Sequence, residues 1–213
     1  MPKMLVTRPE HDDTTFYLSA WAGLVVKEAR QRGITVFDLR GEKANRQHLQ
    51  SLFQTANPDI VMFNGHGSEH MITGHEQEPL IVCGENDGFL NGRVVYAVAC
   101  RAALQLGPSC TSTGGCRAFL GYDDDFVFYS DTSKTSHPLL DRVARPPMEA
   151  SNQVPLSLIK GNSPAEAFSR AQESFRKHIR SLIRSREPEA PYILQALIHN
   201  MTHLRFCSTG HYE

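Results

Sequence analysis

Two apolar runs, each ending at a reactive side chain, decide the fold: Ile60-Val61-Met62-Phe63-Asn64-Gly65-His66-Gly67 and Val94-Val95-Tyr96-Ala97-Val98-Ala99-Cys100. Short runs without polar alternation are typical of strands covered on both faces of a parallel sheet. The first run stops at a histidine between two glycines, and the second stops at a cysteine. We therefore expect two buried strands with His66 and Cys100 at their carboxyl ends.

Strand-like and helix-like segments alternate around these two runs. Before them, the pattern predicts a strand at Leu5-Val6, a helix at 14–32 with Phe16, Ala20, Leu24 and Ala29 near one face, a strand at 34–39 and a helix at 44–55. After them, it predicts a strand at 117–121, helices at 163–185 and 190–200, and a strand at 204–207. This alternation predicts an α/β fold with a mostly parallel sheet of about six strands and helices on both faces.

Two segments interrupt the alternation. Residues 69–83, with a central Gly74, are expected to form a surface hairpin. Residues 130–155 are rich in Ser, Thr and Pro, which predicts a long loop around a short helix at 139–143. Long surface loops often carry function, so we expect this one to become ordered when a substrate or partner binds.

Composition excludes several classes of protein. The 213 residues include 22 Lys and Arg against 23 Asp and Glu, a formal net charge of −1, which argues against nucleic acid as a partner. We assign residues 1–213 to a single domain, and the lack of a long apolar stretch predicts neither an export signal nor a membrane span. Five cysteines at irregular spacing favour reduced thiols in a cytoplasmic protein. We expect no cofactor and no metal.

The carboxyl ends of the two buried strands predict a catalytic pair. Neighbouring strands lie only about 4.8 Å apart, and open α/β sheets gather their functional groups at this edge. Cys100 would attack a carbonyl carbon as a thiolate, and His66 would protonate the leaving amine. The N–H groups of Gly67 and Cys100 would form an oxyanion hole. No side chain that would orient His66 stands out in the sequence.

The segments 60–68 and 94–102 resemble the histidine and cysteine signatures of the caspase-like cysteine peptidases. This group includes caspases, metacaspases, gingipains, separases and bacterial CHAT proteases. Residues 115–122 resemble the strand that follows the nucleophile in CHAT-type members, so the resemblance covers about residues 4–128. It implies a three-layer caspase-like sandwich, with His66 as the catalytic histidine, Cys100 as the nucleophile and Gly67 at the oxyanion site.

The same resemblance implies a cysteine endopeptidase that cuts specific protein substrates, in bacteria commonly within defence or cell-death systems, with an activating protein as a further partner. Two positions depart from the caspase signature: Val98 replaces its Gln and Ala102 replaces its Gly. The histidine also lies closer to the cysteine than the roughly 50 residues of caspases. These departures favour a compact CHAT-like member, and aspartate specificity is not carried over.

Substrate preference has two opposite interpretations. Asp123, Asp124 and Asp125 follow a strand whose end borders the same edge, so they would pair with a Lys or Arg side chain of the substrate. Aspartates in this position are also common in solvated turns. Arg8, after the first strand, would instead bind an acidic substrate residue, although arginine is most often simply a surface residue.

Two rival functions also fit the sequence. A zinc site would use His66, His70, His75 and Cys83, although only the first two approach the usual ligand spacing. Alternatively, the chain is a non-catalytic flavodoxin-like binding or scaffold module, an inactive relative of the proteases whose glycine-bounded loop contacts an anion. The chain lacks both the G-x-G-x-x-G and the G-x-x-x-x-G-K-[ST] phosphate-binding patterns.

Overall fold

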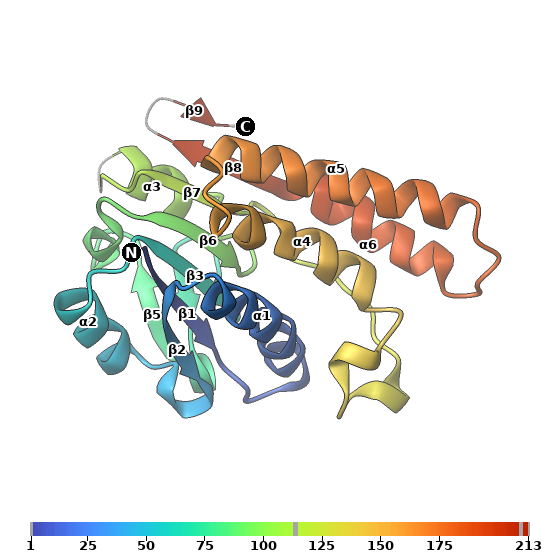
Figure 1. The fold of residues 1–213 in the computed structure, drawn as a ribbon, viewed down its shortest axis with the longest axis horizontal. Helices are drawn as coiled ribbons and strands as arrows, with labels where there is room; N and C mark the ends of the chain where they lie inside the picture. The colour runs from blue at the N-terminus through green and yellow to red at the C-terminus, as the bar shows by residue number, and fades with distance from the viewer. Residues whose placement is uncertain (1, 113–114, 209–210, 213) are drawn as a thin grey trace.

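The computed structural model of the protein describes residues 2–112, 115–208 and 211–212. It confirms an α/β fold with a mostly parallel sheet (Figure 1). The order of the strands across the sheet is β2-β1-β3-β6-β7-β8-β9, and a separate pair is formed by β4 and β5. Neighbours from β2 to β7 run parallel, whereas β8 and the two-residue β9 run antiparallel.

The elements follow the alternation that the sequence predicts, apart from two helices that it does not predict, at Leu106–Ser112 and Arg145–Leu158. The strands are β1 (Lys3–Arg8), β2 (Thr35–Arg40), β3 (Ile60–Asn64), β4 (Met71–Thr73), β5 (Pro79–Val82), β6 (Val94–Val98), β7 (Ala118–Tyr122), β8 (Leu204–Ser208) and β9 (His211–Tyr212). The helices are α1 (Asp13–Gln31), α2 (Arg46–Thr55), α3 (Leu106–Ser112), α4 (Arg145–Leu158), α5 (Pro164–Ile183) and α6 (Ala190–His203).

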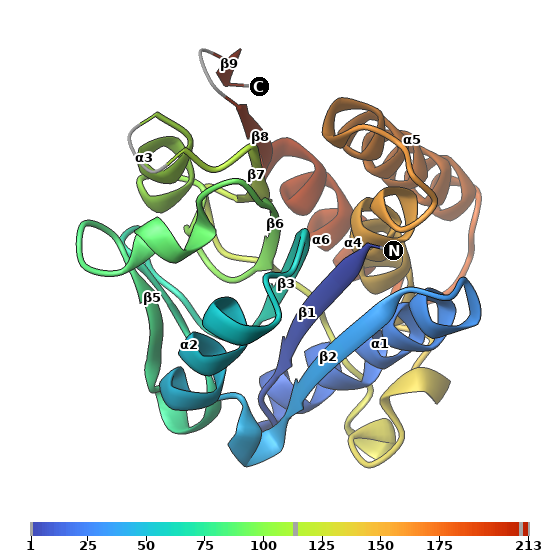
Figure 2. The ribbon, with the colours of Figure 1, turned by 60° about the vertical axis from the view of Figure 1, so that its left-hand side comes forward.

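The sheet separates two apolar cores, as expected for strands buried on both faces. Helices α1, α4, α5 and α6 cover one face, where Met62 and Tyr96 are buried. Helices α2 and α3 and the β4–β5 hairpin cover the other face, where Phe63 and Val95 are buried (Figure 2). Successive residues of one strand therefore enter different cores, which explains why β3 and β6 are apolar throughout.

The predicted hairpin at 69–83 is present as the antiparallel pair β4–β5. Its turn packs against the start of α2, where His75 donates its N–H to the carbonyl oxygen of Ala44 at 2.8 Å. A Cβ atom on Gly74 would lie 2.0 Å from the same oxygen, so this close approach requires glycine. The hairpin is thereby fixed over the face that carries α2.

The prediction of one long loop at 130–155 is wrong in its second half. Helix α4 occupies this part and packs in the core between α1 and α5. Pro146 and Pro147 lie in the first turn, where a missing N–H costs little, so they start the helix instead of breaking it. Before α4, only single turns of 3-10 helix form, at Thr132–Lys134 and Pro138–Leu140.

Helix α1 begins with a capping box at the edge of the sheet where the parallel strands end. Its N-cap is Asp12, whose carboxylate accepts the N–H of Thr15 at 2.7 Å, while the Thr15 hydroxyl accepts the Asp12 N–H at 3.1 Å. The predicted apolar face of α1 is confirmed at Ala29, which is buried, but wrong at Leu24, which is 42% exposed; Tyr17 and Trp21 enter the core instead. Among the described residues, no helix has the length and apolar character needed to cross a membrane.

Candidate active site

The sheet brings the loops that carry His66 and Cys100 together. Strands β3 and β6 are paired in parallel, with Asn64 opposite Val98, so each reactive residue lies two positions beyond a paired residue. The loop backbones also touch: a Cβ atom on Gly67 would lie 3.1 Å from the carbonyl oxygen of Cys100. Gly67 is therefore needed for the close approach of the two loops.

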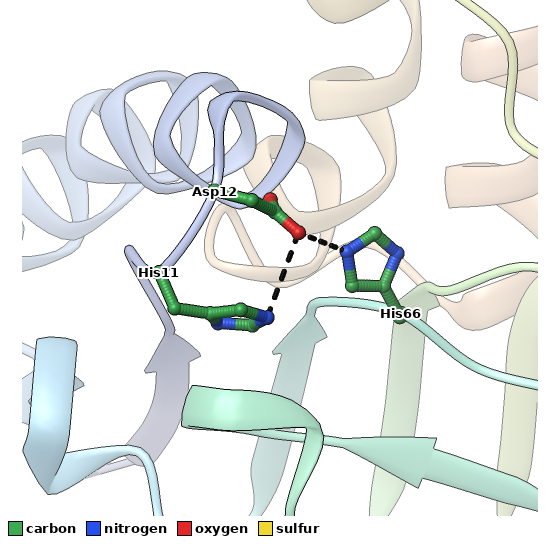
Figure 3. Close-up of side chains that lie close together, drawn as sticks. All are labelled: His11, Asp12 and His66. Atoms are coloured by element: carbon green, nitrogen blue, oxygen red, sulfur yellow. Dashed lines mark hydrogen bonds and ion pairs between the residues drawn. The ribbon is translucent and has the colours of Figure 1, made fainter.

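A third residue, Asp12, contacts His66. Nε2 of His66 lies 2.6 Å from Oδ2 of Asp12, and Figure 3 shows the two side chains converging from the loops after β3 and β1. Burial by itself raises the pKa of Asp12, but hydrogen bonds from the Thr15 N–H and from His66 lower it to about 2. The carboxylate is thus ionised at neutral pH and accepts the proton of Nε2, so a neutral His66 ring has Nδ1 as its free acceptor.

The sequence reasoning missed Asp12 as the residue that orients His66. A signal was available in two parts: Asp12 and Thr15 have the spacing of an N-terminal cap, and the first strand ends just before them. What the sequence does not contain is the order of the strands. Only the placement of β1 beside β3 brings the cap of α1 to the histidine loop.

Cys100 is half-buried and is held as a thiol. Burial raises the pKa of the thiol, and the nearby carboxylate of Asp125 raises it further, whereas the N–H of Phe126 and the charge of Arg101 act in the opposite direction. The net direction is upward, so the group is protonated at neutral pH. The expectation of a thiolate therefore does not describe this resting state, and the thiol must transfer its proton before it can attack.

The backbone turns sharply directly after Cys100. Arg101 has a φ of 59°, a left-handed conformation that is uncommon for a residue other than glycine. Its N–H bonds the carbonyl oxygen of Asp124 at 3.1 Å, which ties the turn to the segment after β7. Unfavourable backbone of this kind persists where the surroundings enforce it, and functional sites are common places for it.

The two proposed oxyanion donors lie in different loops, Gly67 after β3 and Cys100 after β6. In the part of the chain that the structure describes, the N–H groups of Gly67 and Cys100 do not bond to backbone carbonyl oxygens. The neighbouring Thr73 instead fixes the histidine loop, because its N–H and its hydroxyl both bond the carbonyl oxygen of His66, at 2.9 and 3.1 Å.

The three aspartates after β7 have different partners. Asp123 is held by Nδ1 of His203 at 2.8 Å and by Nε of Arg205 at 2.7 Å. Asp124 and Asp125 face Nε of Arg101 at 3.7 and 3.2 Å. Asp125 also interacts with the Cys100 thiol, whereas Asp123 is bonded to two side chains of the C-terminal segment. An acidic pocket for a basic side chain stays a prediction.

Arg8 lies at the functional edge but is buried, at 8% exposure. Its guanidinium makes two bonds to Asp38, from Nε at 2.8 Å and from Nη2 at 2.6 Å, and a third to the carbonyl oxygen of Ser19 at 3.1 Å. These bonds join β1 to β2 and to α1. Recognition of an acidic substrate residue by Arg8 would have to break this bidentate pair.

The histidines form a different cluster from the zinc set considered above. The structure does not unite His66, His70, His75 and Cys83 as ligands. Within the described residues, two groups have ligand atoms within 4.8 Å of one another: His11, Asp12 and His66 form the first, and Asp124, His199 and His203 form the second. All five cysteines are free, and Cys110, Cys116 and Cys207 are buried.

Comparisons with known proteins add no assignment: no protein-family model matches the chain, and no curated protein matches it.

Proposed function

We propose that the protein is a cysteine endopeptidase of the caspase-like group that uses Cys100 and His66 on specific protein substrates. The observation that carries the proposal is the pairing of β3 with β6, which delivers histidine and cysteine loops to one edge in matching register. The contact of Asp12 with His66 supports it, because a base oriented by a third group is typical of nucleophilic sites.

The resting protonation states suggest the order of the proton transfers. The ionised Asp12 holds the proton of His66 on Nε2, which leaves Nδ1 to accept the proton of the Cys100 thiol. The sulfur then bonds to the scissile carbonyl carbon, and the N–H groups of Gly67 and Cys100 bind the developing oxyanion. His66 gives its proton to the amine as the C–N bond breaks, and water afterwards hydrolyses the thioester.

The environment of Cys100 favours an enzyme that is activated when substrate binds. A raised pKa keeps the sulfur protonated until a carbonyl group and the oxyanion donors are in position. An activating protein partner would act at the same place by moving Asp125 away from the thiol. Both routes fit a peptidase that must be inactive in the absence of its target.

Cleavage of a degenerate peptide library tests the proposal. We expect the wild-type chain to produce new amino termini, and Cys100→Ala to produce none while keeping its thermal unfolding temperature. Cys83→Ala is the matched control, because Cys83 is also a partly exposed free thiol, and it should keep full activity.

The result that would contradict the proposal is cleavage by Cys100→Ala at the wild-type rate. A wild-type protein that is folded but cleaves nothing, with or without cell extract as a source of activator, would favour the non-catalytic binding module instead.

A further inference from the structure

We infer that His11, Asp12 and His66 form a binding site for one Zn²⁺ ion. Their ligand atoms lie within 4.8 Å of one another, and Figure 3 shows the two imidazole rings directed at the same carboxylate oxygen. Two histidines and one carboxylate are a common protein ligand set for zinc, with the fourth position left to water or substrate. Magnesium and calcium prefer oxygen ligands, so two imidazoles favour a transition metal.

His11 supplies the second, independent observation. Its side chain is 6% exposed, yet neither ring nitrogen has a hydrogen-bond partner among the described residues. Nε2 of His11 is directed toward Oδ2 of Asp12 but is 3.6 Å away, which is too far for a hydrogen bond. A buried imidazole whose nitrogens make no hydrogen bond is unfavourable, and a metal ion would offset this cost.

The distances show how much the site must adjust. Tetrahedral ligands at the usual Zn–N distance lie about 3.3 Å from one another. His11 and Asp12, at 3.6 Å, already have almost this separation, whereas His66 and Asp12, at 2.6 Å, must move apart by about 0.7 Å. The side chain of His66 is 33% exposed, so rotation into the solvent-accessible edge can supply this movement.

Bound zinc would also regulate the proposed peptidase, and this consequence rests on the proposed function. The metal would take Nε2 of His66, the atom that Asp12 holds in the metal-free state. A ring with zinc on Nε2 and a proton on Nδ1 would have no acceptor left for the Cys100 proton. Zinc would therefore inhibit cleavage reversibly, and a chelator would restore it.

Calorimetric titration of metal-free protein with Zn²⁺ tests the site directly, and visible absorption of the Co²⁺-loaded protein reports its coordination. We expect one ion per chain and tetrahedral Co²⁺ bands. His11→Gln should weaken zinc binding at least about tenfold. His66→Gln is the second variant in case loss of the buried His11 prevents folding. His70→Ala, an exposed histidine outside the cluster, should bind as the wild type does.

Two results would overturn the site. One is no stoichiometric zinc binding by the folded wild type, which would mean that a buried water bonds to His11 instead. The other is a His70→Ala variant whose zinc binding is weakened as much as that of His11→Gln. The Cys100→Ala variant separates this inference from the peptidase, because it should bind zinc with unchanged affinity. Cleavage without zinc binding would refute only the metal site. Zinc binding by a protein that cleaves nothing even in its metal-free form would refute only the proposed function.

Discussion

Replacing Asp12 tests the contact that links helix capping to the candidate site. Asp12→Ala removes the N-cap of α1, which is usually worth about 1 kcal/mol and at most about 2. The fall of the Asp12 pKa from 3.8 to about 2 corresponds to about 2.4 kcal/mol. Since the side chain is 37% exposed, solvent screening reduces the stabilisation derived from the pKa to about 1 kcal/mol. Part of this energy is the capping hydrogen bond already counted above.

We therefore expect Asp12→Ala to destabilise the protein by about 1–2 kcal/mol and to lower its Tm by about 3–6 °C. Asp12→Asn keeps a good cap and loses only the charge, so it should lose about half as much. The exposed neighbour Asp13 provides the control, and Asp13→Ala should change stability by less than about 0.5 kcal/mol.

The contribution of Asp12 to stability depends on pH with a fixed sign. A carboxyl whose pKa is depressed in the folded state contributes stability that is complete above the unfolded value of 3.8 and is lost as the pH falls toward about 2. Urea unfolding at pH 7 and pH 2.5, followed by circular dichroism, should show the wild-type advantage over Asp12→Ala shrinking at the lower pH. Equal destabilisation by the Ala and Asn variants, or a difference independent of pH, would refute the reasoning.

Three further predictions concern the same edge and its surroundings. Asp125→Asn should lower the pKa of Cys100 and so raise the rate at which iodoacetamide alkylates it at pH 8 at least about twofold, measured by peptide mass spectrometry. An unchanged rate would show that Asp125 does not affect the thiol. Gly67→Ala should cost about 1–3 kcal/mol in urea unfolding, since its Cβ would lie 3.0 Å from the Cβ of Ala99, and a neutral effect would show that the loops can separate freely. The buried carboxylate of Asp141 accepts hydrogen bonds from the Tyr17 hydroxyl, at 2.8 Å, and from three backbone N–H groups. Asp141→Ala should therefore lower the free energy of unfolding by more than about 2 kcal/mol and expose residues 129–144 to trypsin. Wild-type protease resistance of the variant would contradict this.

Much of the fold could be predicted because local patterns and the final packing agree. Strands β3 and β6 have continuous apolar sequences because their residues enter both cores. Helix α5 begins at the predicted position, where Ser163 and Glu166 bond reciprocally in a capping box. Helix α4 was missed because its prolines indicate a loop in isolation. The first turn tolerates Pro146 and Pro147, and the buried packing of the helix accommodates Pro155 in its interior.

The candidate site could be predicted only in part. His66 and Cys100 follow recognisable strands, so the placement of their loops at one edge follows from a parallel sheet. Asp12 could not be assigned, because its contact depends on which strand lies beside β3. The protonated state of Cys100 depends on burial and on Asp125, a neighbour 25 positions away that only the folded chain brings close.

Covalent labelling by peptidyl acyloxymethyl ketones tests the central claim most directly, since these probes are attacked by a nucleophilic cysteine that a substrate site presents to them. A mixture varying in the residue next to the reactive group should give one adduct per chain, on Cys100, that His66→Ala abolishes and Cys83→Ala leaves intact. No adduct on Cys100, or an adduct that persists at the wild-type rate in His66→Ala, would contradict a Cys100–His66 peptidase.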